Sequence, residues 1–298
     1  MKLKFISFKN QIMLLSVSAL LVAGCNNNAK KEAEDTPPVD STQSTILNVN
    51  GEIFSIPSPI QTAFLLKNSG ATYNKSVLNP PNKSASYSTT FSKGVNLGIY
   101  GADLGYVTIY DQTQDALGYL NAAKKLADEL GVAGAFDANT INRFQKNLGK
   151  QDSMLVLVGV AYRSSDSYLK NNDRNDVSGL VLAGGWIESL YFACNTYKTK
   201  PSEDVKRRIA EQKSSLQSLI KLLTQFYSQP EYTEFVDNLN DLQKVYDGVE
   251  FKYSYQKPSI DPVNKMTVIN STTEVKITPE QIQSITDKIK AIRSQIVG

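Results

Sequence analysis

The sequence predicts a mainly α-helical fold, a multi-helix bundle with a small antiparallel β element from the N- and C-terminal regions. Between about residues 86 and 246, apolar residues recur at helical spacing. Helix starts and ends carry typical signals, a serine followed by proline at Ser58-Pro59 and a terminal glycine at Gly131. Strand-like alternation occurs near the two ends of the folded part, around residues 46–55 and 250–277.

The segment 1–24 has the organisation of a secretory signal peptide. A lysine-rich start precedes an apolar run from Ile12 to Val22, and two small residues follow it. The run is about half as long as the roughly 20 residues of a membrane-spanning helix. Residues Val22 to Cys25 resemble the lipobox of bacterial lipoproteins, which implies cleavage before Cys25, lipid on its sulfur and acylation (for example by palmitate) of the new amino terminus. A plain signal peptide with a chance cysteine is the alternative.

Residues 25–44 are expected to form the lipid anchor and a flexible tether, because their asparagines, mixed charges and prolines offer little surface to bury. A single mainly helical domain is predicted for residues 45–298. It opens with a hairpin around the turn pair Asn50-Gly51. A helix then begins at Ser58-Pro59, where serine is a favourable N-cap and proline suits the first helical position.

Two buried helices are predicted at the centre of this domain. The first spans about Ser86 to Tyr110 and has few charged residues, which is typical of a buried helix. Each glycine lowers helix propensity by about 1 kcal/mol, so a glycine stripe on this helix predicts the close approach of another backbone. The second, from Val177 to about Tyr197, is also nearly all apolar. The glycines of the stripe are Gly94, Gly98, Gly101 and Gly105.

The other helices follow from amphipathic spacing and capping signals. They are predicted at about residues 112–130, 137–148, 151–170, 202–229, 231–246 and from 279 onward. The last begins with a capping box, in which Thr278 precedes proline and Gln281. Strands are predicted at 250–255, 266–269 and 274–277, and they are expected to pair with the N-terminal hairpin in one small antiparallel sheet.

Composition excludes several classes of protein. The chain has 32 Lys and Arg against 29 Asp and Glu, and three of the lysines lie in the signal segment, so the mature chain is predicted to be neutral. A neutral domain argues against a general binder of nucleic acid or anionic membranes. The absence of histidine excludes Ser-His-Asp and Cys-His catalysis and histidine-ligated zinc or haem. With Cys25 acylated, Cys194 is the one remaining thiol, so no disulfide, metal site or other cofactor is expected.

Two acidic residues stand out because their neighbours in the sequence are apolar. Asp103 lies in the first buried helix and Glu188 in the second. Helical side chains lean toward the N-terminus, so Glu188 reaches over Gly184 and Gly185, which leave room beside its carboxylate. One interpretation is that a Tyr hydroxyl, an amide or Arg163 satisfies each acid inside the core.

A second interpretation is a polar-lined pocket for a small ligand. Its contacts would be Asp103, Tyr110, Trp186, Glu188 and Tyr191. A catalytic carboxylate pair, as in glycoside hydrolysis, is the third interpretation. The separation of the two acids does not follow from the sequence, so no residue is assigned a catalytic role.

Three segments are similar to members of an uncharacterised group of bacterial envelope lipoproteins. They are Ile56 to Pro59, Asn96 to Leu104 and Gly184 to Glu188. The resemblance covers a small part of the chain. It implies a location in the cell envelope, and it implies neither an activity nor any site residues.

The resulting expectation is a protein held in the cell envelope by lipid on Cys25, at the outer membrane and facing the periplasm. The leading functional hypothesis is a non-enzymatic binding or scaffold role, with a cleft for a small ligand or an envelope protein between the two glycine-containing helices. The alternative is a carboxylate-dependent hydrolase of envelope glycans. A structural envelope protein without a pocket is the third hypothesis. Nucleic acid is not an expected partner.

Overall fold

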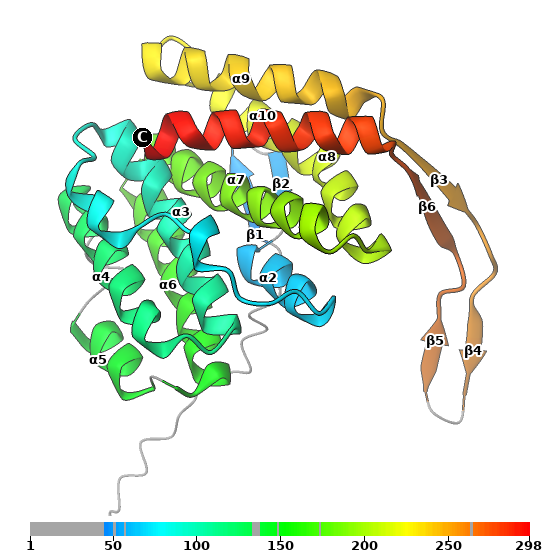
Figure 1. Cartoon of the computed structure of the whole chain (residues 1–298), viewed down its shortest axis with the longest axis horizontal. Helices are drawn as coiled ribbons and strands as arrows, with labels where there is room; N and C mark the ends of the chain where they lie inside the picture. The colour runs from blue at the N-terminus through cyan, green and yellow to red at the C-terminus, as the bar shows by residue number, and fades with distance from the viewer. Residues whose placement is uncertain are drawn as a thin grey trace, which may run out of the picture. The chain divides into compact units, whose positions relative to one another are not determined.

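The computed structural model describes residues 45–49, 52–56, 58–132, 138–147, 149–172, 174–262 and 265–298. These residues belong to a compact unit that runs from Val39 to Gly298. The predicted signal segment, Cys25 and the tether lie outside the described residues. The fold is mainly α-helical, as predicted (Figure 1). Its helices are α2 (Pro59–Asn68), α3 (Thr90–Ile109), α4 (Thr113–Glu129), α5 (Ala138–Lys146), α6 (Gln151–Asn171), α7 (Asn175–Thr199), α8 (Glu203–Thr224), α9 (Pro230–Asp247) and α10 (Pro279–Val297), with short 3-10 turns η1 (Lys75–Val77) and η2 (Pro81–Ala85).

Helices α3 and α7 form the centre of the fold and run in the same direction. They cross where a Cβ on Gly98 would lie 2.0 Å from the carbonyl oxygen of Val181, and one on Gly184 would lie 1.9 Å from that of Val95. No side chain larger than hydrogen fits at these two positions, so the backbones touch. The predicted close approach of another backbone is therefore confirmed at Gly98.

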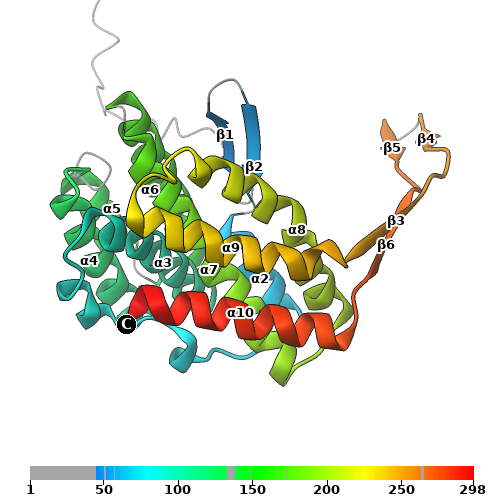
Figure 2. The same ribbon diagram turned by 90° about the horizontal axis from the view of Figure 1, so that it is seen from above.

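Most of the other helices pack around this pair, while α5 packs on α6 at the edge of the fold (Figures 1 and 2). Helices α4 and α6 pack on α3, helices α8 and α10 pack on α7, and α2 contacts both central helices. Helix α9 packs on α8 and α10. By length and composition α7 could cross a membrane, but 94% of its most apolar stretch is buried in the protein, as in the core helix of a globular domain.

Local capping explains where several helices begin. The Thr278 hydroxyl accepts a hydrogen bond from the Gln281 amide at 3.2 Å, and the Gln281 side chain accepts one from the Thr278 amide at 2.8 Å, so the predicted capping box is confirmed. The predicted start at Pro59 is confirmed, although the Ser58 side chain makes no capping bond. Helix α3 begins later than predicted, because Thr89 caps it and residues before it form η2.

The strands form three two-stranded antiparallel ladders in the described residues. Strand β1 (Thr45–Val49) pairs with β2 (Glu52–Ile56). Strand β3 (Glu250–Ser254) pairs with β6 (Thr272–Lys276), and β4 (Ser259–Asp261) pairs with β5 (Met266–Val268). The prediction that N- and C-terminal strands share one sheet is wrong. Each strand finds a partner close in the sequence, which costs less loop-closure entropy than pairing across the chain.

Residues 250–276 form a two-stranded ribbon, called the β-arm below. It connects the end of α9 to the start of α10. Figures 1 and 2 both show it extending beyond the ends of these helices. The side chains of β3 are all exposed, and those of β6 are exposed except for Val275. The β-arm therefore adds little to the hydrophobic core.

Candidate functional site

The parallel packing of α3 and α7 brings Asp103 and Glu188 together in the core. Both side chains are completely buried, with 0% exposure. When Asp103 is protonated it lies within hydrogen-bonding reach of the Glu188 carboxylate. The two acids that stood out in the sequence are therefore neighbours.

Arg293 of α10 completes this cluster. Its Nε lies 2.5 Å from Glu188 Oε2 and its Nη2 lies 2.7 Å from Oε1, which is the two-pronged geometry of a strong carboxylate pair. The same Nη2 donates to the Val77 carbonyl at 3.0 Å. The guanidinium also lies 4.4 Å from the ring centre of Tyr191, a cation–π contact. The side chain of Arg163 lies outside the described residues, so its suggested role is not tested.

The groups around Asp103 stabilise a negative charge much less than the groups around Glu188 do. Its Oδ2 accepts from the Asn79 amide at 3.3 Å, while no donor among the described residues reaches its Oδ1. Burial and the adjacent Glu188 charge raise the pKa of Asp103 well above its usual range. Burial also raises the pKa of Glu188, but Arg293 opposes that shift. We therefore assign a protonated Asp103 next to a charged Glu188–Arg293 pair, which leaves the cluster neutral.

The three aromatic residues of the predicted pocket have different partners, and only Tyr191 contacts this cluster. Trp186 is 2% exposed, and its indole N–H donates to Gln212 at 3.0 Å. Tyr110 is buried, and its ring lies 4.7 Å from that of Tyr106. Tyr191 stacks on Arg293 as described. None of these five predicted residues lines the three pockets described next.

A pocket of about 440 Å³ lies at the C-terminal ends of α3 and α7. This volume is within the range of about 300–1,000 Å³ that is typical of small-molecule sites. Tyr106 of α3 and Phe192 of α7 contribute to its wall, with ring centres 4.7 Å apart. The segment before and in η1 closes its other side. The lining residues are Gly70, Ala71, Thr72, Tyr73, Asn74, Val77, Tyr106, Phe192, Asn195, Thr196, Thr199 and Lys200.

Hydrogen bonds hold the pocket segments in place. The Asn74 amide donates to the Tyr106 hydroxyl at 3.2 Å, which fixes the loop against α3. The Lys200 ammonium donates to the Gly70 carbonyl at 2.6 Å, which fixes the other end of the loop against α7. Tyr73 donates to Asp115 of α4 at 2.6 Å. The pocket is therefore shaped by contacts that exist without a ligand.

The lining combines aromatic rings with amide and hydroxyl groups, and the described residues that form it include no acid. Lys200 is its one cation, and its ammonium is already engaged by a carbonyl. Such a surface offers an apolar wall and several neutral hydrogen-bonding groups. It suits an uncharged ligand that carries hydroxyl or amide groups.

Val77 links the pocket to the buried cluster. It is one of the lining residues of the pocket, and its carbonyl accepts from Arg293. The Glu188–Arg293 pair therefore supports the pocket wall from behind, and it does so without reaching the pocket itself.

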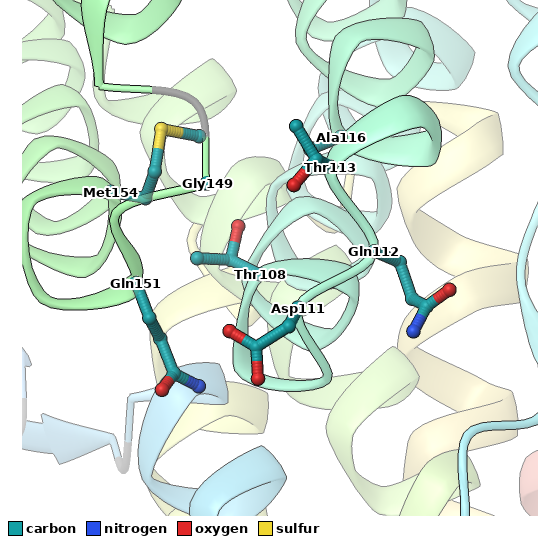
Figure 3. Close-up of a pocket in the computed structure, with 8 residues that line it drawn as sticks. All are labelled: Thr108, Asp111, Gln112, Thr113, Ala116, Gly149, Gln151 and Met154. Atoms are coloured by element: carbon teal, nitrogen blue, oxygen red, sulfur yellow. The ribbon is translucent and has the colours of Figure 1, made fainter.

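Two further hollows are less suited to a small ligand. The first, about 20 Å³, lies beside the turn from α3 to α4 and holds little more than one water (Figure 3). It is lined by Thr108, Asp111, Gln112, Thr113, Ala116, Gly149, Gln151 and Met154. The second, about 430 Å³, is a more open groove along α3, α9 and α10 that includes Glu231 and Glu234.

No group of three or more His, Cys, Asp or Glu residues that could hold a metal ion occurs among the described residues. Cys194 is 1% exposed, and burial raises the pKa of its thiol to about 12, so it is a poor nucleophile or ligand. Comparisons of the chain with protein-family models, with curated proteins and with solved structures found no match. The resemblance to envelope lipoproteins therefore stays a prediction.

Sequence reasoning missed Arg293 and the 440 Å³ pocket. Arg293 follows Ile292 in α10, where it reads as one of several basic residues of an amphipathic helix. The pocket polar groups Asn195, Thr196 and Thr199 form the polar end of α7, which is typical of a helix that reaches the surface. The sequence did offer one signal, because a charged Glu188 inside the core needs a cation beside it. In the described core that cation is Arg293.

Proposed function

We propose that this protein is a non-enzymatic binding lipoprotein of the bacterial envelope, whose ligand occupies the pocket at the ends of α3 and α7. The observation that carries the proposal is this 440 Å³ pocket, built by the two glycine-containing helices and the loop at 70–77. It lies at the ends of those helices, and none of its lining residues is among the five predicted from the sequence.

The ligand class follows from the lining. An uncharged sugar has an apolar C–H face that can lie on the partly exposed ring of Tyr73, and hydroxyl groups that amides and hydroxyls can bind. An acetamido group would add an amide for Asn74 or Asn195. A neutral or acetamido oligosaccharide, as present in envelope glycans, fits these groups best.

The buried acids favour binding over hydrolysis. Glycoside hydrolysis requires two carboxyl groups that reach the substrate from either side of the bond. Asp103 and Glu188 have no exposed surface, and Arg293 occupies both oxygens of Glu188. The hydrolase hypothesis therefore gains no support from the site.

The test of anchoring is the mass of the protein after extraction from its own envelope and denaturation. A chain that begins at Cys25 and carries acyl groups supports the lipoprotein assignment. An unmodified chain contradicts it.

The test of binding is calorimetric titration of the same protein with acetamido and neutral oligosaccharides. Thr199→Val removes a hydroxyl from the pocket lining, and Asn195→Leu removes an amide. Thr224→Val is a matched control, because Thr224, like Thr199, donates to the carbonyl four residues earlier in its helix but lies outside the pocket. We expect about fivefold weaker binding for each pocket variant, from the loss of one hydrogen bond of about 1 kcal/mol. Equal affinity in all three variants would contradict the pocket assignment.

A further inference from the structure

Exposed apolar side chains are concentrated in the β-arm. Nine large hydrophobic residues of the described chain are exposed, and seven of them lie between residues 251 and 269. Their exposed fractions range from 42% to 75%. The other two exposed residues are Tyr168 and Tyr227, and the Tyr227 hydroxyl donates a hydrogen bond to Asp237. The seven are Phe251, Tyr253, Tyr255, Ile260, Met266, Val268 and Ile269.

These side chains do not serve the packing of the domain. In the β3–β6 ladder, Phe251 lies opposite Val275 and Tyr253 lies opposite Thr273, so the aromatic rings share one face. Both ladders of the β-arm are two-stranded, so each strand keeps an unpaired edge among the described residues. Exposed apolar side chains concentrated in one segment in this way indicate an interaction site.

The distal ladder exposes apolar groups on both of its faces. Ile260 lies opposite Thr267 on one face, while Met266 and Val268 lie on the other, because alternate residues of a strand point to opposite sides. A folded protein partner would cover one face and leave the other in water. A lipid surface surrounds a thin ribbon and covers both faces at once.

The charge of this stretch is positive. Between residues 251 and 269 there are three lysines, Lys252, Lys257 and Lys265, and one acid, Asp261. The ends of the β-arm add Glu250, Glu274 and Lys276, so the β-arm as a whole has a net charge of +1 and the positive excess lies in its distal part. All three lysines are exposed. The predicted mature chain is neutral as a whole, so this excess is local. Lysines beside aromatic and aliphatic residues are the composition of segments that bind anionic membrane interfaces.

We propose that the β-arm is a second membrane contact, which inserts its apolar side chains at the headgroup level of a bilayer rich in anionic phospholipid. This inference rests on the lipoprotein assignment, because the lipid on Cys25 keeps a bilayer close to the domain. The chain between Cys25 and β1 can extend by at most about 3.5 Å per residue, so 26–44 reaches roughly 65 Å. The bilayer that carries the anchor is therefore within reach of the domain.

The two contacts together would fix the orientation of the domain. A lipid on a flexible tether holds a protein near the bilayer but leaves it free to rotate. A second contact at the β-arm removes that freedom and sets the direction in which the pocket opens.

A fluorescent label at the β-arm tests this proposal in the full, lipidated protein. Ile260→Cys places a reactive thiol on the distal ladder for an environment-sensitive dye. Cys194 is buried with a raised pKa and stays unlabelled, and Cys25 is acylated in the proposed form. Lys290→Cys on α10 is the matched control, since residue 290 is exposed on the helical part. Both labelled proteins are reconstituted in vesicles of phosphatidylethanolamine with phosphatidylglycerol, and in vesicles of phosphatidylcholine alone.

The expected result is a blue-shifted emission at position 260 that a lipid-attached quencher reduces several-fold more than it reduces emission at position 290. The effect should be greater with phosphatidylglycerol. Replacing Lys257 and Lys265 by glutamine should lower the equilibrium constant for β-arm insertion about fivefold per lysine removed. Equal quenching at positions 260 and 290 in both lipids would overturn the proposal. So would a label at 260 that is shielded only when envelope proteins are added, which would indicate a protein partner.

The mass of the denatured protein separates this inference from the lipoprotein assignment. A mass without acyl groups contradicts the anchor. In that case the Ile260→Cys chain is prepared with Cys25→Ser, so that the dye attaches only at position 260. It is then mixed with preformed vesicles, and the response at position 260 still decides whether the β-arm binds lipid.

Discussion

Two conservative substitutions in the buried cluster should reduce stability by very different amounts. Asp103→Asn keeps the shape and the neutral charge that we assign to the protonated acid. Glu188→Gln removes the negative charge that holds Arg293 in the core. The first variant should therefore lose about 1 kcal/mol or less near pH 5, and the second about 3–5 kcal/mol, the usual cost of leaving a buried charge without its partner.

The pH dependence gives the sharper test of the Asp103 assignment. Below the pKa of an unfolded aspartate, about 3.9, both the folded and the unfolded chain hold the proton. Above it the unfolded chain releases the proton while the folded chain keeps it, because burial and Glu188 raise the pKa of Asp103 in the fold. The folded chain then binds one proton more than the unfolded chain, so the free energy of unfolding falls with rising pH by about 1.4 kcal/mol per unit, until the folded pKa is reached.

The groups that face Asp103 come from every element around it. Glu188 on α7 and Arg293 on α10 are the charged ones, and the Asn79 amide is its hydrogen-bond donor. Because the asparagine side chain of the Asp103→Asn variant cannot titrate, the difference in unfolding free energy between the wild type and this variant isolates the one carboxyl group. Trp186, the single tryptophan, lies buried in α7 and reports unfolding by fluorescence.

The measurement is urea unfolding of the wild type and both variants at unit steps from pH 4 to pH 8. We expect the wild type to lose stability relative to Asp103→Asn as the pH rises. Two parallel profiles would refute the assignment of the proton to Asp103. A Glu188→Gln variant as stable as Asp103→Asn would refute the charged pair with Arg293.

Three further predictions concern packing and capping. Gly98→Ala should cost about 1–3 kcal/mol or more, because its Cβ would overlap a backbone carbonyl of α7. The control Gly118→Ala should gain up to about 1 kcal/mol in α4, since its Cβ meets ordinary contacts; both are checked by urea unfolding. Gln212→Leu should cost about 1–3 kcal/mol by leaving the Trp186 N–H unpaired, and the emission maximum of Trp186 should change. Thr278→Ala should cost about 1 kcal/mol and loosen the start of α10, as amide hydrogen exchange would show.

The helical elements were predictable because their signals are local. A capping box at Thr278 and a proline at position 59 mark helix starts from within a few residues. The glycine stripe that includes Gly98 predicted contact with another backbone, and the backbone of α7 makes that contact. The pairing of the strands was not predictable from the alternation of apolar and polar residues. This alternation indicates that a segment is a strand, but it does not indicate which other strand pairs with it.

The candidate site was predictable only in part. The apolar surroundings of Asp103 and Glu188 indicated two buried acids, and both are buried. The cation that stabilises Glu188 lies 105 residues further along the chain. Nothing in the sequence around Arg293 distinguishes it from a basic residue on a helix surface. The pocket depends on where α3 and α7 end relative to the loop at 70–77, which is set by tertiary packing.

The position of Arg293 near the end of the chain also affects when the protein can fold during its synthesis. Translation produces α3 and α7 well before α10, so both acids of the core exist before the cation that neutralises one of them. Until α10 is available, the two central helices cannot close around Glu188 without enclosing an unbalanced charge. A nascent chain should therefore stay open and accessible to proteases and chaperones until its last helix docks, and a chain interrupted before α10 should be removed rather than accumulate as a folded fragment.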